Sequence, residues 1–138
     1  MSKSLVTFVG VAHPWMCDVM GHVNVRHYAA MFDDASFQLL GHIAGQDDNQ
    51  ASQIGWADVR TEIDYRHETK AGALITIHSH VVKIGRTSIT FEQVMLGSLD
   101  GIVRASSRTT SVRFDLAARA SVALDEPMRD RSSAFLIE

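Results

Sequence analysis

The sequence VRHYAAMFDDASFQLLGHI, residues 25–43, decides the fold that we expect for this chain. Its apolar side chains recur at spacings of three and four, which places them on one face of a helix. They are Val25, Tyr28, Ala29, Phe32, Ala35, Leu39, Leu40 and Ile43. Asn24 is a good N-cap, and Gly45 is a good stop just beyond the last turn. The pattern therefore predicts one long helix between these two residues.

Three further apolar residues, Ala30, Met31 and Phe37, widen the stripe. We therefore expect this helix to be buried on more than one side. No other segment shows a comparable helical pattern. From Asp115 onward the chain is rich in Ala, Arg and Ser, which predicts a short helix or a loose extension.

Strand patterns surround the helix. Leu5–Ala12 is rich in Val and Phe and predicts a first strand. The polar stretch Gln46–Gly55 predicts a loop. Four segments that alternate or are rich in β-branched residues follow it: Ala57–His67, Ala73–Ile84, Thr87–Leu96 and Ile102–Phe114. Gly85–Arg86 and Asp100–Gly101 are tight-turn candidates between them.

This order, one strand, one buried helix and then four strands, predicts an α+β protein with an antiparallel meander. A lone apolar helix must be wrapped by that sheet. The sheet keeps open edges, and edges that pair across a two-fold axis are a common remedy. We therefore expect a homodimer, with a homotetramer as an open alternative.

Composition places the chain among single-domain globular proteins. Its 138 residues fit one domain, 1–138, with a core at about 5–114 and a C-terminal extension at 115–138. A net charge of −3, without any basic run, argues against a nucleic-acid partner. The single cysteine suits a reducing compartment. We see no signal peptide at Met1–Val11 and no apolar run near the roughly 18 residues of a membrane span. We expect a cytoplasmic protein without a membrane partner.

The loop before the helix, WMCDVMGHVN at residues 15–24, holds the chemistry that we expect. Asp18, Gly21, His22 and Asn24 lie within it, directly before a helix N-terminus with unpaired N–H groups. A carboxylate beside such groups suits acyl transfer, either as nucleophile or as general base. The competing interpretation of Asp18 is a turn or cap residue, because Asp commonly bonds its local backbone.

For the other reactive residues in the chain we favour structural or surface roles over catalytic ones. Cys17 precedes Asp18, which works against a lowered thiol pKa, so we prefer a buried structural thiol. The histidines match no metal-site spacing, and His78 with His80 fits a half-exposed strand face. Acidic residues on the helix fit solvated carboxylates, with a substrate-lining role as the alternative; they are Asp33 and Asp34. We expect both tryptophans to cover the core or line a pocket; they are Trp15 and Trp56.

The spacing of Asp18, Gly21 and Tyr28, together with the predicted strand and helix order, resembles the hot-dog fold acyl-CoA thioesterases of the 4-hydroxybenzoyl-CoA thioesterase type. The resemblance covers about Leu5 to Phe114. It implies a five-stranded antiparallel sheet around one long central helix, and dimers formed through sheet edges. It also implies that Asp18 is the nucleophile or general base and that the Val25 N–H binds the oxyanion.

The Gly21–Asn24 sequence, GHVN, also resembles plant acyl-carrier-protein thioesterases, which implies a catalytic role for His22 beside Asp18. Met20 replaces the catalytic Asn of those enzymes, and the histidine that some bacterial relatives carry at position 25 is absent. The family's strands line an acyl and pantetheine pocket at the dimer interface. The residues that the resemblance assigns to substrate binding are Gly21, Asn24, Tyr28, Tyr65, His67 and Ser88.

The sequence thus predicts an acyl-CoA thioesterase that hydrolyses a small or medium acyl-CoA to a free acid and CoA. No metal or bound cofactor is expected, since CoA enters as part of the substrate. Two alternatives stay open: a dehydratase or hydratase acting on hydroxyacyl or enoyl thioesters, and a non-catalytic acyl-CoA binding module.

Overall fold

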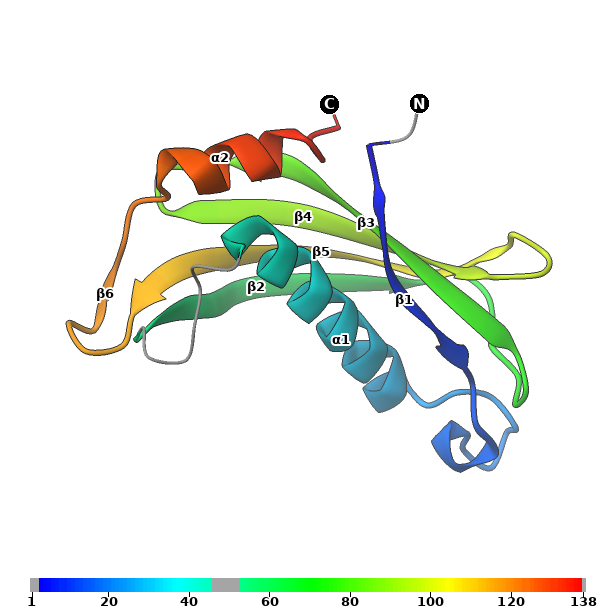
Figure 1. Cartoon of the computed structure of the whole chain (residues 1–138). Helices are drawn as coiled ribbons and strands as arrows, with labels where there is room; N and C mark the ends of the chain where they lie inside the picture. The colour runs from blue at the N-terminus through cyan, green and yellow to red at the C-terminus, as the bar shows by residue number, and fades with distance from the viewer. Residues whose placement is uncertain (1–2, 46–52, 138) are drawn as a thin grey trace.

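A computed structural model describes residues 3–45 and 53–137 of the chain (Figure 1). In order, its elements are β1 (Leu5–Val11), the short 3₁₀ helix η1 (Pro14–Met16), α1 (Val25–Ala44), β2 (Ile54–Tyr65), β3 (Leu74–Ile84), β4 (Ser88–Gly97), β5 (Val103–Asp115), β6 (Ala120–Ser121) and α2 (Glu126–Ser133). Most of the predicted loop Gln46–Gly55 lies outside the described residues. Its last two residues were wrongly assigned, because Ile54 and Gly55 pair with β5 and begin β2.

The strands form one antiparallel sheet in the order β1-β3-β4-β5-β2, and β6 adds to β5 beyond this path. The described residues therefore form six strands where five were predicted. The predicted meander is confirmed for β3, β4 and β5 but is wrong for β2. Because β1 already occupies the free side of β3, β2 pairs with β5 instead, from Ile54 opposite Asp115 to Tyr65 opposite Ala105.

Helix α1 lies across one face of the curved sheet (Figure 1). Both predicted ends are confirmed: the Asn24 side chain accepts a hydrogen bond from the Arg26 N–H, and the Gly45 N–H donates to the Gly41 carbonyl. The helix is buried on its sheet-facing side. The opposite side stays open, since the Phe37 side chain is 78% exposed. Burial on more than one side is therefore wrong for the single chain, where one sheet face covers one helix face.

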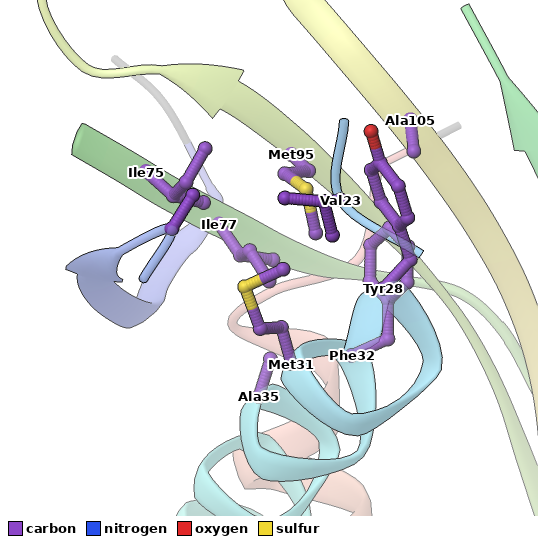
Figure 2. Packing of buried hydrophobic residues seen from close by; sticks show 10 residues of the cluster. Val23, Tyr28, Met31, Phe32, Ala35, Ile75, Ile77, Met95 and Ala105 are labelled. Atoms are coloured by element: carbon purple, nitrogen blue, oxygen red, sulfur yellow. The ribbon is translucent and has the colours of Figure 1, made fainter. Parts of the chain in front are cut away.

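Two apolar clusters fill the space between helix and sheet. The first surrounds the N-terminal half of α1, and Figure 2 shows how Tyr28, Met31 and Phe32 meet Ile77 and Met95. The second surrounds the C-terminal half and includes Leu124 and Met128 from the tail. Its members that are buried are Leu39, Leu40, Ile43, Ala44, Val81, Ile89, Phe91, Leu124 and Met128. The predicted short helix in the tail is confirmed as α2, and it packs on the core.

A buried polar row separates the two clusters. Ser79, Gln93 and Ser107 are direct neighbours on β3, β4 and β5, and the Gln93 amide bonds both serine hydroxyls in either of its two orientations. Ser79 also lies 2.8 Å from the Thr7 hydroxyl on β1. Because each partner is satisfied, this row is tolerated in the core and opposes slippage of the strands.

Neither α1 nor α2, the α-helices of the described residues, is long and apolar enough to cross a membrane.

Candidate active site

The loop that precedes α1 closes on itself as a tight turn. The Asp18 N–H donates to the His22 carbonyl at 3.0 Å, and the Gly21 N–H donates to the Asp18 carbonyl at 3.0 Å. Gly21 has φ of +77°, a conformation that a side chain would strain. The Asp18 carboxylate accepts the Met20 N–H at 2.8 Å, so in this structure it bonds its own turn.

The start of α1 lies directly after this turn. The Asn24 side chain accepts the Arg26 N–H at 3.2 Å, and the Asn24 carbonyl accepts the His27 N–H at 2.9 Å. Asn24 is therefore held as a helix cap. The Val25 N–H takes part in neither of these two hydrogen bonds, and it lies at the positive end of the helix dipole. Such a group suits a developing negative charge on a carbonyl oxygen.

A cavity of about 260 Å³ opens at this end of the helix. It brings together five residues that the sequence assigned to the site: His22, Val25, Tyr28, Tyr65 and His67. Val23, Arg66 and Glu68 complete its lining. The rings of Tyr28 and Tyr65 meet edge to face, with centroids 5.3 Å apart and planes at 78°. The cavity thus joins the helix start to the end of β2.

The segment after β2 forms the other wall; sequence reasoning assigned His67 in it to the site but missed Glu68 and Thr69. The Tyr28 hydroxyl donates to Thr69 Oγ1 at 2.8 Å, and the Val23 N–H donates to the Thr69 carbonyl at 2.8 Å. His22 Nε2 lies 3.1 Å from Glu68 Oε2. No local spacing could have indicated Glu68 or Thr69, because the fold alone brings them to the helix start.

The remaining predicted site residues do not line this cavity. Asp18 and Gly21 form the adjacent turn, and Asn24 caps the helix. Ser88 begins β4 opposite Val112. Ala105 lies opposite Tyr65, so Ser88 lies about 23 Å along β5 from this end of β2, at roughly 3.3 Å per residue.

The secondary candidates fall outside the cavity as well. Trp15 is 69% exposed, so its predicted core or pocket role is wrong for the single chain; it stacks on His13 instead. Trp56 packs against the second cluster and lines a separate cavity of about 400 Å³, as predicted. Cys17 is half-buried against the first cluster. Among the residues at 3–45 and 53–137, no three His, Cys, Asp or Glu side chains gather as metal ligands.

The antiparallel sheet, its single long helix and the cavity at the helix start define an α+β protein with a candidate site at the start of α1. Comparison with known proteins makes this specific: the family model of the thioesterase-like superfamily matches residues 12–131. The chain belongs to this superfamily and is a thioester hydrolase. The predicted hot-dog fold is confirmed with it.

Three relatives illustrate the similarity. The chain is 27% identical over 114 residues to the long-chain acyl-CoA thioesterase FadM of Escherichia coli K12, covering 83% of this chain and 86% of the relative. The structure of SAV2348 from Staphylococcus aureus, in complex with CoA, matches with a TM-score of 0.86 at 12% identity, covering 98% and 85%. Slr0204 from Synechocystis, a 1,4-dihydroxy-2-naphthoyl-CoA thioesterase, matches with a TM-score of 0.79 at 15% identity, covering 93% and 95%.

Proposed function

We propose that this chain hydrolyses acyl-CoA thioesters to a free acid and CoA. The observation that carries the proposal is the cavity at the start of α1, in which Val25 shares the lining with His22 and two tyrosines. The names of the relatives support the substrate class, since one is an acyl-CoA thioesterase and another was solved with CoA.

The chemistry follows from the helix start and the turn before it. The thioester carbonyl oxygen accepts the Val25 N–H, and the helix dipole stabilises its developing charge. Asp18 attacks the acyl carbon or activates the water that does so. Water is added across the C–S bond, so the acyl carbon gains the hydroxyl and the sulfur leaves as the thiol. The protein supplies no metal or cofactor in this scheme.

The substrate-binding residues fall into two groups. Tyr28, Tyr65 and His67 contact the acyl-pantetheine part inside the cavity, while Gly21 lets the turn approach it closely. Ser88 lies at the far end of β5 from this cavity, so it reaches a substrate there only from a second chain.

A dimer through β2 supports that arrangement. In the described part of the sheet β2 is an edge, and Val59 at its centre is 64% exposed. An edge of this length leaves backbone groups that a second β2 can pair. Sedimentation of the wild type should show a dimer, and Val59→Lys should shift it toward monomer. A monomeric wild type contradicts this assembly. A cytoplasmic location is part of the proposal and rests on the single cysteine.

The decisive experiment is a thiol-release screen over short, medium, long and aryl acyl-CoAs. Asp18→Asn should lower kcat with the best substrate by about a hundredfold or more, because the variant keeps the shape but not the base or nucleophile. Asp34→Asn is the matched control, since it removes one exposed carboxylate from α1 outside the cavity. Equal rates for wild type and Asp18→Asn refute the assignment of Asp18.

Two other readouts test the alternatives. Addition of water to an enoyl-CoA without thiol release indicates a hydratase. Tight binding of an acyl-CoA without turnover across the panel indicates a binding module. Either result refutes the proposed hydrolysis.

A further inference from the structure

Glu68 lies in contact with His22 in the lining of the candidate cavity. Its Oε2 lies 3.1 Å from His22 Nε2, and both side chains line the cavity that Val25 also borders. Glu68 is the one carboxylate in that lining. The pair therefore places an imidazole, an acid and the helix start around one space.

Hydrogen bonds connect the backbone segment that carries His22 to the segment that carries Glu68. His22 and Lys70 form an antiparallel bridge, and the Val23 N–H donates to the Thr69 carbonyl at 2.8 Å. The Tyr28 hydroxyl ties Thr69 to α1. With these bonds made, the imidazole and the carboxylate can change their separation only by rotating their side chains.

An ionised carboxylate only accepts hydrogen bonds, so the His22 nitrogen that faces it must carry the proton. A neutral imidazole with its proton on Nε2 has an unprotonated Nδ1. We propose that Glu68 is the positioning residue of His22: it fixes the Nε2–H tautomer, so that Nδ1 is the ring nitrogen that accepts a hydrogen bond from the hydrolytic water or the substrate. This role rests on the proposed function.

If Glu68 formed only a surface ion pair with His22, its loss would change neither kcat nor the tautomer of His22. The Glu68 side chain is 70% exposed, and exposed pairs contribute little to folding. Loss of Glu68 should therefore leave the melting temperature unchanged under either interpretation. The charged or titratable groups near the pair, Arg66, His67 and Lys70, stay in place in a Glu68 variant. A change in kcat and in the His22 tautomer is thus specific to positioning.

The test uses Glu68→Gln in the full chain, with Glu92→Gln as the matched control. Glu92 on β4 pairs with His80 Nε2 at 3.4 Å and does not line the cavity, so its variant removes a carboxylate from another histidine. We expect Glu68→Gln to lower kcat with the best acyl-CoA about tenfold, while KM stays within about twofold. Glu68→Asp should recover part of the rate, and Glu92→Gln should match the wild type.

Nitrogen-15 NMR of the imidazoles supplies a readout that needs no substrate. At about pH 8, where free imidazole is neutral, wild-type His22 should show the Nε2–H tautomer, and Glu68→Gln should shift it toward a mixture. An unchanged kcat in Glu68→Gln, or an Nδ1–H tautomer in the wild type, overturns the proposal. If no acyl-CoA is hydrolysed, the proposed function fails. The tautomer measurement still decides whether Glu68 fixes the Nε2–H tautomer of His22.

Discussion

The hydrogen bond between Tyr28 and Thr69 offers a quantitative test of how the site is attached to the fold. The Tyr28 hydroxyl donates to Thr69 Oγ1 at 2.8 Å, and Thr69 is fully buried while Tyr28 is nearly so. Tyr28→Phe removes the donor and leaves a buried hydroxyl unpaired, as does Thr69→Val from the other side. Each single change should lower the free energy of unfolding by about 1–3 kcal/mol, the cost of an unsatisfied buried group.

The double variant should cost little more than either single one, because it leaves neither hydroxyl behind. The cycle therefore predicts a coupling of about 1–2 kcal/mol, measured from urea unfolding curves at one protein concentration. Tyr65→Phe is the control: the side chain is half-exposed, so its loss should stay within about 0.5 kcal/mol. If the two single effects add to within about 0.5 kcal/mol in the double variant, the bond does not hold the segment as argued.

Three further outcomes are expected. Tyr65→Ala should raise kcat/KM for long relative to short acyl-CoAs about tenfold, because the Tyr65 ring packs against Tyr28 in the lining of the candidate cavity and its loss enlarges the space for an acyl chain. An unchanged ratio in the acyl-CoA panel would argue against this. The Ile102 N–H bond holds the pKa of Asp100 below its ordinary 3.8, so charged Asp100 adds stability above that pH, which is lost as pH falls through the lowered value. Asp100→Asn should therefore be less stable than wild type at neutral pH and converge with it in acid, as followed by thermal melts. Met128→Ala should cost about 2–5 kcal/mol in urea unfolding while leaving kcat unchanged, and a matching loss of kcat in the folded variant would contradict the separation of tail and site.

Local residues were sufficient to predict α1 and the central strands. Asn24 caps the first turn and Gly45 ends the last turn through local hydrogen bonds, to which Arg131 of α2 adds bonds to the Ile43 and Ala44 carbonyls. The order of the strands in the sheet was harder to predict from local residues. Consecutive strands are expected to be neighbours only where a tight turn connects them. The connection from β2 to β3 is long enough to cross the sheet, and β1 blocks the place beside β3.

The packing of the C-terminal tail and the exposure of the outer face of α1 were also hard to predict from local residues. The α2 segment is polar on average, and the core contacts of the tail depend on a few side chains such as Leu124, just before α2, and Met128 within it. Nothing in its composition distinguishes these anchors from a loose extension. Phe37 and Trp15 are apolar by type yet exposed in the single chain, and residue type alone cannot tell a core position from a surface that a second chain covers.

For the site, sequence reasoning found the residues of the helix start, and Tyr65 and His67 near the end of β2, but not Glu68 and Thr69. His22, Val25 and Tyr28 lie within one short stretch, whose spacing the family resemblance could match. Glu68 and Thr69 reach them only because β2 ends beside the helix start. The role of Asp18 stays a prediction: its carboxylate accepts the Met20 N–H, which is the turn role that competes with catalysis.

The division of the core gives the site a measure of independence from the rest of the chain. Val23 and Tyr28 belong to the first cluster, whereas Leu39 and Met128 belong to the second, and the Gln93 row lies between them. Tyr28 and Leu39 are about 16 Å apart along α1, at 1.5 Å per residue. Effects at sites that far apart usually add without coupling. Changes that adjust the tail can therefore alter stability without displacing the helix start, while changes at Thr69 alter both, because that residue is at once a buried partner of the core and the backbone support of the cavity wall.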